Sequence, residues 1–179
     1  MRRFLYTVVI VLFMLTLPAC GYSLAGRGSF LPEHIRTIGV PLFVNNTPVF
    51  EIEQRFTQRV RSELIGRGRY TVESRRTAVD AVLLGEIQSI VLNVAAFNEQ
   101  QVATRYSLTV VMKVEFRDVK NDKVIWSNNA WPFTDQFEVT NVTSGAVTAD
   151  VFLGQDINAQ ERLASEFARA LVSAILEAF

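Results

Sequence analysis

The chain has 179 residues with 18 basic and 18 acidic side chains, so its formal net charge is zero. This balance excludes the broadly basic surface on which nucleic-acid binding depends. A single cysteine, Cys20, and a single histidine, His34, exclude a disulfide scaffold and a metal site built from histidine and cysteine. His34 is expected in a surface loop.

The N-terminus has the pattern of a bacterial export signal. Two arginines precede an apolar run from Phe4 to Leu17, which is shorter than the roughly 20 residues of a membrane-spanning helix. The run ends in Leu-Pro-Ala-Cys, which resembles a lipobox, the signal at which the cysteine is lipidated and the chain is cut before it. We therefore expect residues 1–19 to be removed and Cys20 to carry the lipid that tethers the chain to a membrane. A plain secretory signal with an incidental cysteine, or a single-span anchor, is the alternative.

The rest of the chain suits one domain of ordinary size. Residues 20–34 begin with a glycine-rich stretch and are expected to form a lipidated lead-in without a catalytic role. Residues 35–179 are expected to form a single α+β domain. Its first strand is predicted at 35–43, before an Asn-Asn-Thr-Pro turn.

A helix is predicted from the Thr47–Pro48 start to about Ile65, because threonine can cap the first turn and proline is tolerated there. Apolar residues recur at every fourth position and are expected to form one buried stripe of Ile52, Phe56, Val60 and Leu64. The glycines at 66 and 68 predict the end of the helix, and a second strand is predicted at 69–74.

Long strands are predicted between Asp80 and Val139. The run from Ala81 to Phe97 changes the phase of its alternation near Ser89, which predicts a bulge. The clearest strand lies at 105–116, where alternation predicts a core face of Tyr106, Leu108, Val110, Met112, Val114 and Phe116. An antiparallel meander is expected to continue to Trp126, but the proline at 132 leaves the segment 128–139 without a clear assignment.

Residues 141–155 are predicted to bridge to a last helix, which begins at Asn158 and reaches nearly to Phe179. Its apolar side, including Leu163, Phe167 and Leu171, is expected to face the core. We expect both amphipathic helices to pack on one face of a mostly antiparallel sheet of about four to five strands, which is a two-layer α+β sandwich.

The mature chain is predicted to start with Cys20-Gly21-Tyr22-Ser23-Leu24-Ala25-Gly26, followed by a strand, a helix, a short strand, long strands and a C-terminal helix. This start and this order resemble the LptE family of lipopolysaccharide-assembly lipoproteins. The resemblance implies an outer-membrane lipoprotein of Gram-negative bacteria that faces the periplasm, binds lipopolysaccharide and sits as a plug inside its β-barrel partner LptD. Gly21 fits this location, since glycine after the cysteine permits outer-membrane sorting in the enterobacterial rule. No nucleic-acid partner, no metal and no cofactor other than the covalent lipid on Cys20 is expected.

A second resemblance stays open. The strand at 38–43, the turn and helix after it and the run at 78–85 are also similar to secretion-associated lipoproteins of the curli-secretion type and to the amino-terminal domain of TolB. Those families imply another cargo. An enzyme is not expected, because the sequence has no Gly-x-Ser-x-Gly, no His-Glu-x-x-His and no phosphate-binding glycine loop.

Lipopolysaccharide binding needs cations for phosphate beside apolar surface for acyl chains. Arg105 and Lys113 are expected on the outward side of the clearest strand, and Lys120 lies in the basic turn after it. We predict these three residues as lipopolysaccharide contacts. A solvated sheet face with a basic turn is the alternative.

Overall fold

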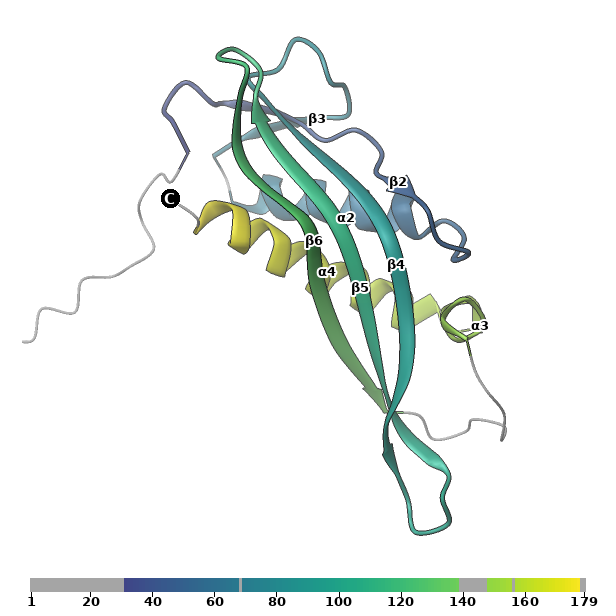
Figure 1. Ribbon diagram of the computed structural model, residues 1–179. Helices are drawn as coiled ribbons and strands as arrows, with labels where there is room; N and C mark the ends of the chain where they lie inside the picture. The colour runs from purple at the N-terminus through teal and green to yellow at the C-terminus, as the bar shows by residue number, and fades with distance from the viewer. Residues whose placement is uncertain (1–30, 68, 139–147, 156, 178–179) are drawn as a thin grey trace, which may run out of the picture.

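The computed structural model describes residues 31–67, 69–138, 148–155 and 157–177. Figure 1 shows one open sheet with the two longer helices side by side behind its long strands. The elements in chain order are β1 (Thr37–Gly39), β2 (Val44–Asn45), α2 (Ile52–Gly66), β3 (Thr71–Glu73), β4 (Ala81–Phe97), β5 (Ala103–Asp118), β6 (Lys123–Glu138), α3 (Ala149–Gln155) and α4 (Ile157–Leu176).

The sheet is six-stranded and mixed, with the order β3-β1-β4-β5-β6 and with β2 paired to β4 beyond the end of β1. Strands β4, β5 and β6 form an antiparallel meander. The pairs β1–β3, β1–β4 and β2–β4 are parallel, so the expectation of a mostly antiparallel sheet of four to five strands is wrong. Helix α2 accounts for the β1–β3 pair, since a helical crossover brings the next strand back in the same direction.

Strand β5 has the alternation that its sequence predicts. Every second residue from Tyr106 to Phe116 is at most 4% exposed, and Arg105 and Lys113 lie on the other side. The register between β4 and β5 shifts between Ile87 and Ser89, which confirms the predicted bulge.

Strand β6 runs through the segment that the sequence left unassigned. Pro132 pairs with Val111 of β5, and β6 is the last strand of the sheet. Since no further strand of the described chain needs the N–H that proline lacks, an edge position tolerates Pro132. Trp131 and Phe133 lie on the opposite side of β6 from Pro132 and face the helices.

The core lies between the helices and the sheet. Phe56 of α2 stacks on Phe167 of α4 with ring centroids 4.3 Å apart. Phe167 also meets Trp131 and Phe133 edge-on, at 5.6 and 5.8 Å. The predicted apolar positions of the two helices are buried: Ile52, Phe56, Val60 and Leu64 in α2, and Leu163, Phe167 and Leu171 in α4.

Helix α2 begins at Ile52 and not near the predicted Thr47–Pro48 start. The Thr47 N–H and hydroxyl both donate to the side-chain oxygen of Asn45, at 2.9 and 2.8 Å, so they stabilise a local turn and do not cap the helix. Glu51, directly before the helix, has a left-handed backbone with a φ of 60°.

Helix α3 occupies part of the segment that the sequence predicted as a bridge. Its Phe152 contacts the rings of Tyr106 and Phe137 at 6.0 and 5.5 Å, and its Leu153 is fully buried. These tertiary contacts stabilise a helix that is too short to persist on local propensity.

Candidate functional site

The predicted lipidation and sorting residues, Cys20 and Gly21, lie outside the described residues, as does the predicted signal at 1–19. Their roles stay predictions. Leu31, near the end of the predicted lead-in, is 3% exposed and belongs to the core.

Lys113 lies in a groove on the sheet face away from the helices. The groove has a volume of about 210 Å³, and it joins the segment around β2 to strands β4 and β5. Two of its apolar residues, Leu42 and Val44, are about half exposed. The groove is lined by Pro41, Leu42, Val44, Arg76, Leu84, Gly85, Glu86, Lys113 and Glu115.

The two acids of this groove already have donors. Glu86 lies opposite Lys113 in the sheet register, but its carboxylate accepts the Asn46 side-chain amide at 2.7 Å. Glu115 pairs with Arg117 at 2.8 Å. No ion pair joins Lys113 or Arg76 to a carboxylate of the described residues. The groove therefore has two cations without an ion-pair partner among the described residues, beside exposed apolar side chains and two carboxylates.

The structure does not bring the three predicted lipopolysaccharide contacts together. Arg105 and Lys113 lie on one side of β5, but about 26 Å apart at about 3.3 Å per residue. Arg105 is paired with Glu138 of β6 at 2.9 Å. Lys120 is exposed in the turn after β5. Only Lys113 of the three lies in the groove.

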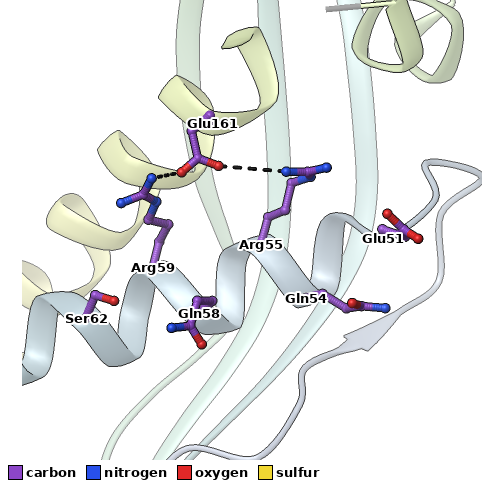
Figure 2. Close-up of a pocket in the computed structure, with 7 residues that line it drawn as sticks. All are labelled: Glu51, Gln54, Arg55, Gln58, Arg59, Ser62 and Glu161. Atoms are coloured by element: carbon purple, nitrogen blue, oxygen red, sulfur yellow. Dashed lines mark ion pairs between the residues drawn. The ribbon is translucent and has the colours of Figure 1, made fainter. Parts of the chain in front are cut away.

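A second groove, of about 410 Å³, lies between the helices (Figure 2). Arg55 and Arg59, one turn apart on α2, both reach toward Glu161 of α4, and the Arg55–Glu161 distance is 3.8 Å. Glu51 also lines the groove, so its two acids balance its two arginines. These ion pairs link α2 to α4 on the solvent side of the helical layer.

A polar cluster joins the start of the described chain to the turn between β5 and β6. His34 Nε2 lies 2.7 Å from Asp118 Oδ2, and Asn121 donates its backbone N–H and side-chain amide to the same carboxylate. Burial raises the pKa of Asp118, but the hydrogen bonds from Asn121 and His34 outweigh it and lower the pKa to about 2. His34 thus lies in a turn, as expected, but its ring is partly buried and has a hydrogen-bond partner.

The described residues include no group of three or more histidine, cysteine or acidic side chains that could hold a metal ion. Within the same ranges, no helix combines the length and the apolar character that a membrane span needs.

The described residues thus form an α+β domain with cations beside exposed apolar side chains on the open face of its sheet. Comparison with protein families is more specific, because the model of the LptE family, described as lipopolysaccharide-assembly, matches residues 35–177. The chain therefore belongs to the LptE family, and the recognition made from the sequence is confirmed. The family has no cofactor, and membership supports a non-enzymatic outer-membrane lipoprotein of the lipopolysaccharide-assembly type.

The solved structures that are similar to this chain have low sequence identity. The hypothetical protein CT253 from Chlamydia trachomatis is 10% identical, with 81% of this chain and 99% of that chain covered and a TM-score of 0.50. A PelC variant from Paraburkholderia phytofirmans, solved as a dodecamer, is 16% identical over 79% of this chain and 88% of that chain, with a TM-score of 0.48. The rare lipoprotein B from Shewanella oneidensis is 12% identical over 79% of this chain and 98% of that chain, with a TM-score of 0.37. A search of curated proteins found no match.

Proposed function

We propose that this chain is an outer-membrane lipoprotein that faces the periplasm, binds lipopolysaccharide and acts as plug and assembly partner of a β-barrel translocon of the LptD type. The observation that carries the proposal is the LptE family match over residues 35–177. Lipid on Cys20 supplies the membrane tether in this proposal, and Gly21 permits sorting to the outer membrane.

The groove around Lys113 is the best candidate for the ligand's phosphate and acyl groups. Lys113 and Arg76 supply cations without a carboxylate partner in the described chain, and Leu42 and Val44 supply exposed apolar area beside them. Exposed ion pairs contribute only about 0 to 1 kcal/mol each. Affinity in this site therefore depends on the combination of charge with apolar contact.

Arg105 and Lys120 are separate contacts in this proposal. Because Arg105 lies about 26 Å from Lys113 along β5, one phosphate group cannot touch both side chains. The pairing of Arg105 with Glu138 lowers its expected contribution further. Substituting Lys113 should therefore weaken binding more than substituting Arg105.

Binding of purified lipopolysaccharide to the Lys113→Glu/Arg76→Glu variant tests the groove. We expect affinity to fall about tenfold or more, which is about 1.4 kcal/mol or more. Wild-type affinity should also fall as salt screens the exposed charges. The matched control is Arg169→Glu, which changes a 62% exposed arginine on α4, in the helical layer. Unchanged binding in a folded double variant would eliminate the groove as the site.

Co-purification of the lipidated chain from detergent extracts tests the partner. A stoichiometric complex with one large barrel protein is the expected result. A ring of identical copies without a barrel would instead support the secretion-type alternative.

A further inference from the structure

Strand β4 is paired with β5 along its length, but its other side is paired only in its first half. On that side β1 pairs at Ala81 and Val82, and β2 pairs at Glu86 and Ile87. The chain then leaves the sheet at Asn46, whose N–H donates to the Ile87 carbonyl at 3.0 Å. From residue 88 to 97, no strand of the described chain pairs with this side of β4. Within the described part of the chain, the sheet therefore has an open edge that begins where β2 ends.

The register identifies the backbone groups on this edge. The Ile87 carbonyl points toward β2, so Ile87 and Met112 are a pair that exchanges no backbone hydrogen bonds. The next residue of β5, Val111, then directs its backbone groups toward β4, where it pairs with Ser89. Alternation beyond Ser89 directs the N–H and C=O groups of three residues to the open edge: Ile90, Leu92 and Val94.

The opposite edge of the sheet, along β6, is protected at several positions by the protein itself. Pro132 has no N–H to offer. The N–H groups of Ala130 and Gln136 donate to neighbouring side-chain oxygens at 3.0 and 2.8 Å, and the Gln136 carbonyl accepts from Arg162 of α4 at 3.0 Å. Proline and local side-chain contacts of this kind protect edge strands from pairing.

The β4 edge lacks this protection. Among the described residues, no side chain bonds to the outward backbone groups between Ile90 and Val94. The sequence from residue 88 to 104 contains one charge, Glu99, and no proline. Four large apolar side chains of this hairpin are 42–57% exposed: Val91, Val94, Phe97 and Val102. Figure 1 shows that the β4–β5 hairpin extends beyond the helices.

We infer that the β4 edge from Ile90 to Val94 is a docking site at which an extended segment of another polypeptide adds to the sheet as a strand. The backbone identifies the occupant, because a row of outward N–H and C=O groups at strand spacing is satisfied by another extended peptide and not by acyl chains. This interaction goes beyond the proposed lipopolysaccharide and plug functions.

The side chains around the edge indicate which residue types the docked segment should have on each of its faces. Residues of the segment that face the core side lie beside Ile90 and Leu92, which pack against the core, so these residues are apolar. Residues on the other side lie beside Val91 and Asn93 and are uncharged, since the edge offers no counter-charge. Wall strands of a closed barrel have no free edge. A barrel partner therefore contributes a loop or a terminus.

Hydrogen exchange on the full chain in detergent tests the inference with a defined probe. The probe is a capped peptide of alternating threonine and valine, about eight residues long, which is an ordinary strand length. The control probe is the same peptide with every amide N-methylated, so that neither of its edges can donate. We expect the unmodified probe to slow exchange in residues 88–97 at least tenfold. The N-methylated probe and residues 129–138 of β6 should show no such change.

Two lysine variants provide a matched pair. Val91, Thr109 and Thr134 lie in one row across β4, β5 and β6, so Val91→Lys and Thr134→Lys place the same charge in the same row at opposite edges. Val91→Lys should weaken probe binding at least tenfold, and Thr134→Lys should leave it within about twofold of wild type.

Three results with the probes would overturn the inference: no protection of residues 88–97 at millimolar probe, equal protection by the N-methylated probe, or protection of β6 instead. Protection without any probe that grows with protein concentration, together with dimers in sedimentation, would also overturn it, because the occupant would then be a second copy of this chain.

Discussion

Replacing Phe167 with alanine should remove the aromatic centre of the core. The ring is fully buried and contacts three others, Phe56 at 4.3 Å and Trp131 and Phe133 at 5.6 and 5.8 Å. Truncating a buried phenylalanine costs about 3–5 kcal/mol, and an aromatic pair adds about 0.5–1.5 kcal/mol beyond its buried area. Truncating Phe56 removes only one aromatic pair, its stack on Phe167. Phe167→Ala should therefore cost about 1–3 kcal/mol more than Phe56→Ala, the value of the two further pairs.

Urea denaturation of the two single variants, the double variant and wild type measures these differences. Domains of ordinary size have about 5–15 kcal/mol of stability, so Phe167→Ala should lower the midpoint strongly. The double variant should cost less than the sum of the singles, because both singles remove the same stack. Phe50→Ala is the control, since its ring is 88% exposed and should change stability by less than about 0.5 kcal/mol. A loss below about 1 kcal/mol for Phe167→Ala, or a larger loss for Phe56→Ala, would refute this description of the core.

Three further predictions follow from single sites. Hydrogen bonds lower the pKa of Asp118 in the folded protein from 3.8 to about 2, so the contribution of this carboxylate to folding stability is present above about pH 4 and is lost as pH falls toward 2. In Asp118→Asn, the free energy of unfolding should therefore depend less on pH in that window. An unchanged pH dependence would contradict the assignment. Gly85→Ala should lower the free energy of unfolding by about 1–3 kcal/mol through overpacking, because the added Cβ would lie 2.2 Å from the methyl group of the buried Met112. In the control Gly154→Ala, in α3, the added Cβ meets nothing within 4 Å, so denaturant titration should show unchanged or higher stability. Cys20→Ser should abolish labelling with radioactive palmitate and release the chain from membranes. Labelling of the serine variant would contradict the lipid anchor.

The elements with a clear apolar period, β5 and α2, could be predicted from the sequence in most detail, whereas the proline in β6 obscured a strand of similar length. In β5 every second residue is buried, and in α2 the apolar residue at every fourth position is buried, so the apolar pattern of each sequence indicates its buried face. Strands β1, β2 and β3 have only two or three residues, too few to show a period. The parallel direction of β1 and β3 follows from the α2 crossover and not from any residue pattern.

The candidate groove could be predicted only in part. Outward alternation in β5 identifies Lys113, but the groove also needs Leu42 and Arg76 from two other segments. The parallel pairing of β2 with β4 and the register of β4 with β5 bring these segments together. In the sequence, Arg76 is only part of a charged turn, and the link between His34 and Asp118 spans 84 positions. Neither has a local pattern.

The outer face of the long strands is divided by charge, and this division separates the two proposals. Around Lys113 the face also has the Arg76 side chain, so phosphate groups of a ligand have counter-charges there. Farther along, the rows that contain Ser89, Val91 and Asn93 pair only with uncharged residues of β5 and β6. A phosphate group finds no counter-charge in those rows. An uncharged peptide strand gains no electrostatic stabilisation from the charged residues around Lys113. Lys113→Glu should therefore weaken lipopolysaccharide binding without affecting the peptide probe, and Val91→Lys should do the reverse. If either substitution impaired both ligands in a folded protein, the two sites would not be independent.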